Sequence, residues 1–407
     1  MNVKELVKKW EEVLNEGKKI TNPKVLKSTA VMLENEHKHL MESSYTEGSL
    51  SRSGPYATSG DFYKIAVPMV RRTFPELVAH EIVGVQPLTG PVGLAFALRF
   101  RSGADIGTNV QYAGEWNKEL GYNTIDRTYS GSVITSAGEA LGSNKAGTPG
   151  TYGLGIGTGQ QIQEVNMTVE KKQVEAKTRK LRSRWSLEVA QDLKAMHGLD
   201  IEEEMMDILA YEITQEIDRE LIYEIRSAAT LSVATSAKFD YNDAVTVDGR
   251  WEAEKYRNLW NLVIRKTNQI AINTRRGSGN FIIVSPNVAV AFETMPSFTI
   301  APVPGDASTA PTGVARLGSL DGRITVYRDT FATQDEIIVG YKGPSEYDAG
   351  VIYLPYIQLL AMRATFEDSF QPTVGLMSRY AIYGGVTTDL LFGSQNYYQY
   401  IKVVNLP

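Results

Sequence analysis

The sequence has 407 residues, of which 43% are hydrophobic and 22% charged, and its formal net charge is −5. This composition is typical of a folded protein of two or three domains, at roughly 150 residues each, and it lacks the basic excess of a dedicated DNA-binding protein. The absence of cysteine excludes disulfides, thiolate metal sites and thiol catalysis, as expected in a reducing compartment such as the bacterial cytoplasm.

The N-terminal region is predicted to be helical. Its first twenty residues are too charged for a signal peptide, so we expect no export by that route, and no later run of about 18 apolar residues predicts a membrane span. Apolar spacing predicts one helix over residues 3–14 and a second, polar helix from Pro23 to Met41, while the Ser- and Gly-rich residues 43–60 predict a flexible junction. The segment is either detachable from the main fold or packed on its core, and the sequence leaves both interpretations open.

A long irregular stretch follows a short apolar region. Residues 65–85 are helix-like and residues 94–100 are typical of a strand, whereas residues 102–161 are rich in glycine and have little periodicity. Connections beyond about 12–15 residues are uncommon inside a domain. We therefore predict a long two-stranded excursion whose partners lie on another subunit.

The most regular element is a helix that begins after Asp200. Its apolar residues recur at every fourth position: Ile201, Met205, Leu209, Ile213, Ile217, Leu221 and Ile225. Because a spacing of four exceeds the 3.6-residue turn, the apolar stripe winds around the helix, which must then bury different faces against different neighbours. We interpret this helix as a structural spine, preceded by a basic strand over residues 167–185 and a short helix over residues 186–197.

The last 150 residues mix helices and strands. A helix over residues 251–273, a buried strand over 281–284 and a helix from Pro286 to Glu293 are predicted. Strands then dominate, over residues 324–327, 336–341, 351–356 and 376–383. The pattern predicts an α+β protein whose sheets are largely antiparallel.

No catalytic arrangement is visible in the sequence. His37 and His39 stand two apart on a predicted helix and point to different sides, so they do not predict a metal site. The glycines between Gly153 and Gly159 match neither the dinucleotide fingerprint nor a Walker loop. We predict that the protein is not an enzyme and holds no metal or cofactor.

Several motifs resemble one protein family. They are Met69–Arg72, Phe74–Ala79, Gly84–Pro87, Phe96–Arg99, Val174–Arg179, Ala190–Leu193, Glu216–Glu220, Phe281–Pro286, Val339–Gly343, Tyr347–Gly350 and Phe370–Tyr380. Together they resemble the major capsid proteins of T-even-like tailed bacteriophages over most of residues 60–407. The resemblance implies the tailed-phage major capsid fold.

The resemblance also implies a domain plan. The expected segments are an N-terminal helical segment and arm (1–60), an arm or helix of the main fold (61–89), an extended loop (90–170), a peripheral domain with the spine helix (171–239), an axial domain (240–365) and strands returning to the peripheral domain (366–407). The extended loop is short for the family, so its insertion domain is expected to be absent or vestigial, and stability of the shell must come from other contacts or an accessory protein.

The function that the resemblance implies is structural. We expect self-assembly into hexameric capsomers of a phage head that encloses double-stranded DNA without sequence-specific binding, with assembly in the host bacterial cytoplasm and residence in the virion capsid. The expected partners are other copies of the chain and vertex, portal, scaffold and accessory capsid proteins, with no membrane. The alternatives are a pentameric vertex paralogue of the same fold and a cellular nanocompartment shell protein.

Two kinds of site residue are predicted. Relatives are cut by a prohead protease after a Leu-x-Glu motif, which Leu40, Met41 and Glu42 match, as do residues 14–16. The candidate inter-subunit contacts are aromatic, basic and acidic residues of the extended loop, the basic strand and the start of the spine. They are Tyr112, Trp116, Lys177, Arg179, Lys180, Arg182, Arg184, Glu202, Glu203 and Glu204. The basic strand is interpreted as meeting acidic neighbours, for instance on an adjacent subunit, in preference to nucleic acid.

Overall fold

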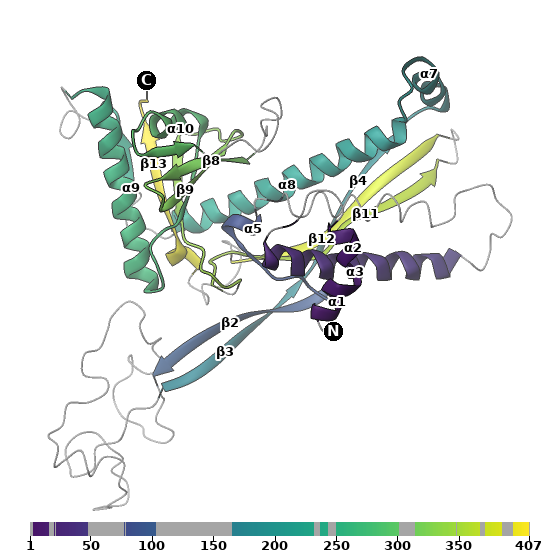
Figure 1. The fold of residues 1–407 in the computed structure, drawn as a ribbon, viewed down its shortest axis with the longest axis horizontal. Coiled ribbons are helices and arrows are strands. Elements are labelled where there is room, and N and C mark those ends of the chain that lie inside the picture. The colour runs from purple at the N-terminus through teal and green to yellow at the C-terminus, as the bar shows by residue number, and fades with distance from the viewer. Residues whose placement is uncertain are drawn as a thin grey trace, which may run out of the picture.

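Helices and strands are mixed along the chain, which confirms the predicted α+β class. The computed structural model describes residues 3–15, 20, 22–47, 77, 79–102, 165–231, 237–242, 250–300, 314–346, 348–366, 371–384 and 394–406. Their strands form sheets of four, seven and two strands (Figure 1). Most of the helix-like stretch predicted over residues 65–85 lies outside these residues, and its described part contains α5 (Ala79–Ile82).

The four-stranded sheet is built on a long hairpin. Its strands, in order, are β1 (Gly84–Val85), β11 (Ile352–Thr365), β12 (Pro372–Tyr383) and β4 (Lys177–Arg184). The predicted axial domain ended at residue 365 and so included β11, but this assignment is wrong, because β11 pairs along its length with β12. Consecutive strands joined by a short connection pair with each other, and the boundary at residue 365 cut that hairpin at its turn.

The seven-stranded sheet contains the C-terminal strand. Its order is β5 (Ala237–Asp240), β13 (Tyr398–Val404), β10 (Glu336–Gly340), β6 (Phe281–Val284), β9 (Ile324–Asp329), β8 (Val314–Leu320) and β7 (Phe298–Ile300). The prediction that residues 366–407 return to the peripheral domain is therefore wrong for β13, which lies between β5 and β10. This strand is buried on both faces over its first four residues, and Lys402 is exposed.

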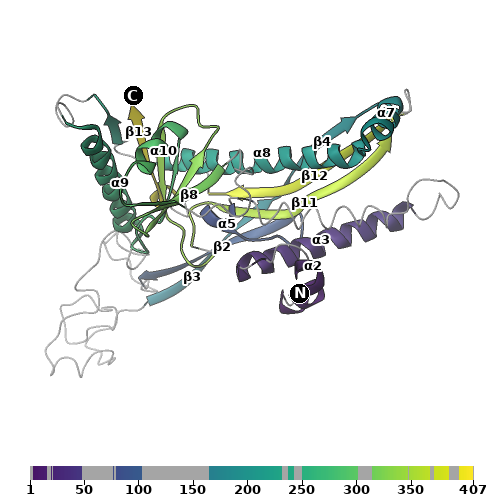
Figure 2. The same ribbon diagram turned by 45° about the horizontal axis from the view of Figure 1, so that its top comes forward.

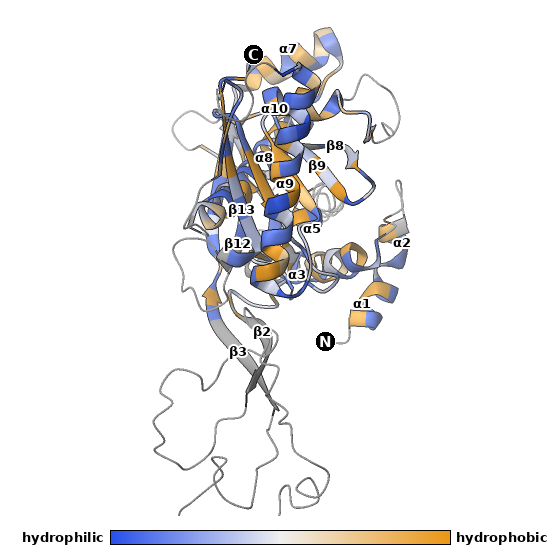
Figure 3. Cartoon of the chain, turned by 90° about the vertical axis from the view of Figure 1, so that its left-hand side faces the viewer, coloured by the Kyte–Doolittle hydropathy of each residue, from blue (hydrophilic) through white to orange (hydrophobic). Residues whose placement is uncertain are grey.

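Antiparallel pairing predominates in the described sheets, as predicted. Three of their ten strand pairings are parallel, namely β1–β11, β5–β13 and β6–β9. The helices α9 (Glu252–Thr274) and α10 (Pro286–Glu293) flank the seven-stranded sheet at the predicted positions. Hydrophilic and hydrophobic residues alternate along α9 (Figure 3), and one side of the helix is buried, including Leu259 and Val263.

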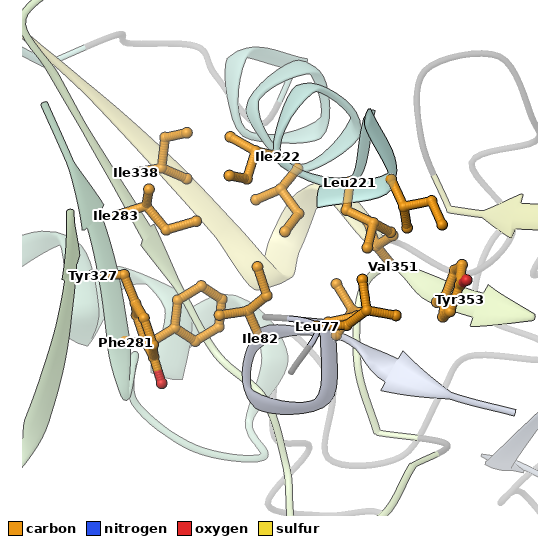
Figure 4. Close-up of a cluster of buried hydrophobic side chains, with 14 of the residues drawn as sticks. Leu77, Ile82, Leu221, Ile222, Phe281, Ile283, Tyr327, Ile338, Val351 and Tyr353 are labelled. Carbon is orange, nitrogen blue, oxygen red and sulfur yellow. The ribbon is translucent and has the colours of Figure 1, made fainter. Parts of the chain in front are cut away.

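The spine helix α8 (Ile201–Leu231) connects the two large sheets. It contacts β4 and β12 of the four-stranded sheet and β10 and β13 of the seven-stranded sheet. The central residues of the predicted stripe, Leu209 to Ile225 at every fourth position, are all buried. Figure 4 shows Leu221 beside Val351, and Ile222 beside Ile338 of the other sheet. At about 1.5 Å per residue the helix is roughly 46 Å long. It is preceded by α7 (Leu187–His197), whose caps are Ser186 and Gly198.

The N-terminal helices pack on the body of the protein (Figure 2). They are α1 (Val3–Lys9), α2 (Glu11–Asn15) and α3 (Pro23–Glu47). The predicted flexible junction was wrong for residues 43–47, which continue α3, since no glycine or proline interrupts the chain before Gly48. The sequence left open whether this segment is detachable or packs on the core of the main fold, and in the structure it is packed.

A two-stranded ribbon projects away from both large sheets (Figure 1). It consists of β2 (Val92–Ser102) and β3 (Val165–Glu175), which pair antiparallel over their full length. The ribbon leads into the Gly-rich residues 103–164, on which the predicted two-stranded excursion falls and which lie outside the described part of the chain. β3 continues past residue 170, where the extended loop was predicted to end.

Candidate assembly surfaces

The basic strand β4 forms one edge of the four-stranded sheet. Its burial alternates, as the two-residue period of a strand requires, with Arg179, Leu181 and Ser183 half-buried. The cations of the opposite face, Lys180, Arg182 and Arg184, are exposed, as is Lys177 at the start of the strand. The guanidinium carbon of Arg184 lies 5.1 Å from the centre of the Phe366 ring. The five predicted cations therefore do not form one surface.

Arg179 faces the spine helix and is bound within the chain. Its Nη1 donates to Glu216 Oε2 at 3.1 Å, and its Nη2 donates to Glu220 Oε2 at 2.7 Å. The Tyr380 hydroxyl donates to the same Glu220 oxygen, and burial together with this hydrogen bond raises the pKa of Tyr380. The predicted acidic partners of the basic strand thus lie, for Arg179, on α8 of the same chain.

The three glutamates form the first turn of α8, where carboxylates are stabilised by the positive end of the helix dipole. The helix is capped by Asp200 Oδ1, which accepts a hydrogen bond from the backbone N–H of Glu202 at 3.0 Å. Glu202 also forms an ion pair with Arg363 of β11. Glu203 and Glu204 are exposed.

The other predicted site residues have no described side chains. Tyr112 and Trp116 lie outside the described residues. Leu40, Met41 and Glu42 lie in the helical backbone of α3, before its end at Glu47.

An apolar surface at the far end of the spine was not predicted from the sequence. Here α7, the start of α8 and the ends of β11 and β12 come together (Figures 1 and 2), tied by the ion pair between Arg363 and Glu202. Large apolar side chains are exposed on this surface, which we call the tip. They are Leu187, Val189, Met196, Leu199, Met362 and Phe366. The signal was available, since α7 places Val189 and Met196 seven residues apart, on one side of a helix too short to be stable alone.

Neither a metal centre nor a membrane span is evident in the described residues. No group of three or more His, Asp or Glu side chains among them is arranged to hold a metal ion. None of the described helices combines the length and the apolar character needed to cross a bilayer. The features that stand out are surfaces: an open sheet edge, a projecting ribbon and an apolar tip.

Comparison with known proteins identifies the family of the chain. The family model described as "Major capsid protein Gp23" matches residues 59–403. The chain belongs to this family. The major capsid protein of Vibrio phage KVP40 is 32% identical over 405 residues, covering 83% of this chain and 77% of that protein. That of Salmonella phage ViI is also 32% identical, and covers 93% of this chain and 89% of that protein.

Two further similarities are weaker. The capsid vertex protein of Enterobacteria phage T4 is 25% identical over 237 residues, covering 54% of this chain and 53% of that protein. The solved capsid structure of Myoviridae phage XM1 aligns with a TM-score of 0.43 at 8% identity, over 81% of this chain and 92% of that chain.

Membership of this family settles the class of function. The chain is a structural protein of a bacteriophage capsid shell with the tailed-phage major capsid fold, and it is a component of the virion. Because the family is structural, the prediction that the chain is not an enzyme is confirmed.

Proposed function

We propose that the chain self-assembles into hexameric capsomers of a phage head that encloses double-stranded DNA. The observation that carries this proposal is the ribbon of β2 and β3. Among the described strands, each of these two pairs only with the other, while an isolated two-stranded ribbon is at best marginally stable in water. A neighbouring copy that receives the ribbon supplies the missing contacts.

The hexameric role is favoured over the two alternatives. A vertex relative matches about half of the chain at 25% identity, whereas major capsid relatives match 83–93% of it at 32%. A cellular nanocompartment shell is disfavoured by the same phage relatives. The enclosed cargo distinguishes a nanocompartment shell from a phage head, because a nanocompartment encloses protein and a phage head encloses DNA.

The proposed partners follow from this role. Copies of the chain meet in quasi-equivalent contacts, and vertex, portal, scaffold and accessory capsid proteins complete the shell in the host bacterial cytoplasm. The genome is enclosed without sequence-specific binding, consistent with a net charge of −5. The candidate inter-subunit contacts are the exposed cations of β4, Glu203 and Glu204, the residues Tyr112 and Trp116, and the tip.

Electron microscopy of the purified chain over a concentration series tests the proposal. Hexamers, tubes or closed shells are expected as the concentration rises. A single small species at every concentration, also after addition of the phage's scaffold and chaperone proteins, would contradict self-assembly into capsomers.

The exposed tip provides a local test. Met196 is 79% exposed on α7, so a Met196→Glu substitution is expected to change the free energy of unfolding by no more than about 0.5 kcal/mol. A charge placed in an apolar contact between copies is expected to raise the critical concentration for assembly about tenfold or more. Light scattering against concentration measures this, with Ala195→Glu, at the exposed position that precedes Met196 on α7, as the matched control. Equal effects of the two substitutions would mean that the tip is not a contact.

Cleavage after Glu42 remains a prediction. Proteases bind extended substrates, and the motif lies in helical backbone, so the end of α3 must unwind before it is cut. The intact mass of the protein in virions tests this, because a chain that retains Met1 has not been cut.

A further inference from the structure

The helix α3 docks on the body through polar contacts as well as apolar ones. Asn35 Nδ2 donates to the backbone oxygens of Leu88, at 2.8 Å, and Tyr356, at 3.1 Å. At the start of the helix, Lys24 Nζ donates to the backbone oxygen of Pro344 and lies 3.6 Å from Glu346 Oε1. These contacts fix α3 against β11 and the loop that follows β10, and residues 28–36 of α3 are all buried.

The N-terminal helices also form a unit of their own. Leu6, Trp10 and Leu14 are buried, and α1 packs on α3. The carboxylate of Glu34 accepts hydrogen bonds from Lys9 Nζ at 2.7 Å and from Trp10 Nε1 at 3.1 Å. Burial alone would raise the pKa of Glu34, but these two hydrogen bonds, together with the charges of Lys9 and Lys38, outweigh burial and lower the pKa. The described residues of the range 3–47, which we call the N-terminal segment, are therefore also joined to one another by contacts of their own.

Glu36, two residues further along α3, is in the opposite situation. It is 1% exposed, and among the residues that the structure describes neither of its carboxylate oxygens has a hydrogen-bond partner. Burial raises the pKa of Glu36 well above its ordinary value, and no charge in the described part of the chain offsets the shift. Taking a carboxylate out of water without a partner costs several kcal/mol, or about 1.4 kcal/mol for each unit by which its pKa is raised. The group thus opposes the docked arrangement that the rest of the helix favours.

We propose that the N-terminal segment is a cap that docks reversibly on the four-stranded sheet, and that Glu36 is the residue that keeps this docking weak enough to open. The segment lies before residues 59–403, which carry the family match. Its own contacts between Glu34, Lys9 and Trp10 survive when it leaves. Undocking returns Glu36 to water and frees the Leu88 and Tyr356 carbonyls, beside which Val85, Leu88 and Ile352 lie buried.

Hydrogen exchange of the full-length chain, read by mass spectrometry, tests the proposal. In the wild-type chain, the amides of α3 are expected to exchange by local opening, faster than those of β11 and the spine. Glu36→Met keeps the length of the side chain and removes the charge. It is expected to raise the protection of α3 roughly tenfold for each unit of raised pKa that it relieves.

Glu34→Met is the matched control, since it changes the same residue type on the same helix. It removes the partner of Lys9 and Trp10 and is expected to lower the protection of α3. Glu36→Gln, which loses the charge but keeps a polar end, is expected to lie between Glu36→Met and the wild type.

Three outcomes would overturn the proposal. The first is that Glu36→Met lowers the protection of α3 or prevents folding, which would make the carboxylate a stabilising group. The second is that Glu36→Met leaves this protection unchanged. The third is that α3 exchanges only together with β11 and the spine, which would make the segment an inseparable part of the body. None of these readouts depends on the formation of capsomers, so the two proposals fail independently.

Discussion

Reversing the charge of Arg182 is expected to abolish assembly at concentrations where the wild-type chain assembles, while leaving the monomer folded. Arg182 is exposed on the outer face of an edge strand. Exposed substitutions of this kind usually change the free energy of unfolding by no more than about 0.5 kcal/mol. A charge contact between copies recurs at every interface of a shell, and loss of one interface anchor costs about 2 kcal/mol or more. Each particle contains many copies of the chain. Arg182→Glu therefore weakens many contacts in a particle, but it changes only one exposed side chain in a monomer.

The matched control is Arg179→Glu, three residues earlier on the other face of the same strand. The new carboxylate would lie beside those of Glu216 and Glu220, so this variant is expected to lower the free energy of unfolding by about 1–3 kcal/mol. Urea denaturation measures folding, and sedimentation or light scattering measures assembly. Normal particles from Arg182→Glu, or equal loss of folding in both variants, would remove the exposed face of β4 from the interface.

The contrast between these two arginines illustrates what the sequence could predict. The basic run of residues 177–184 and the acidic spine were both recognisable from composition and periodicity. The alternation of a strand already separates Arg179 from Arg182, but which face meets α8 depends on how the sheet packs. The acids that bind Arg179 lie about 40 positions further along the chain, and no local pattern links them.

The absence of a local pattern between distant partners also explains the larger errors of the sequence-based prediction. Periodicity predicted the spine, α9 and α10, because their apolar residues repeat locally. It missed β13, whose neighbours β5 and β10 come from distant parts of the chain and whose near-continuous burial leaves no alternation to recognise. Glu36 lies on the helix that was predicted as polar from Pro23 to Met41, and the packing of this helix, α3, buries its carboxylate.

The second large effect is expected where the spine is attached to the seven-stranded sheet. Arg226 of α8 forms an ion pair with Glu336 of β10, Nη2 to Oε2 at 2.9 Å, and Tyr400 Oη donates to the same carboxylate oxygen at 3.0 Å. The Glu336 side chain is 9% exposed. Arg226→Met leaves this buried carboxylate with Tyr400 alone and is expected to lower the free energy of unfolding by about 2–3 kcal/mol. Arg219→Met is the control, because Asp329 keeps the Phe331 N–H as a donor.

A double variant and a pH series separate the ion pair from simple packing. Burial raises the pKa of Glu336 above its ordinary value of 4.5, and Arg226 opposes that shift. Without Arg226, burial destabilises the ionised carboxylate of Glu336, and this carboxyl group is ionised in the unfolded chain only above about pH 4.5. The decrease in the free energy of unfolding caused by Arg226→Met should therefore be largest near neutral pH and become smaller as the pH falls toward 4.5. Arg226→Met combined with Glu336→Met should return to within about 1 kcal/mol of the wild type. If the loss were the same at every pH and additive in the double variant, Arg226 would stabilise the spine by packing alone.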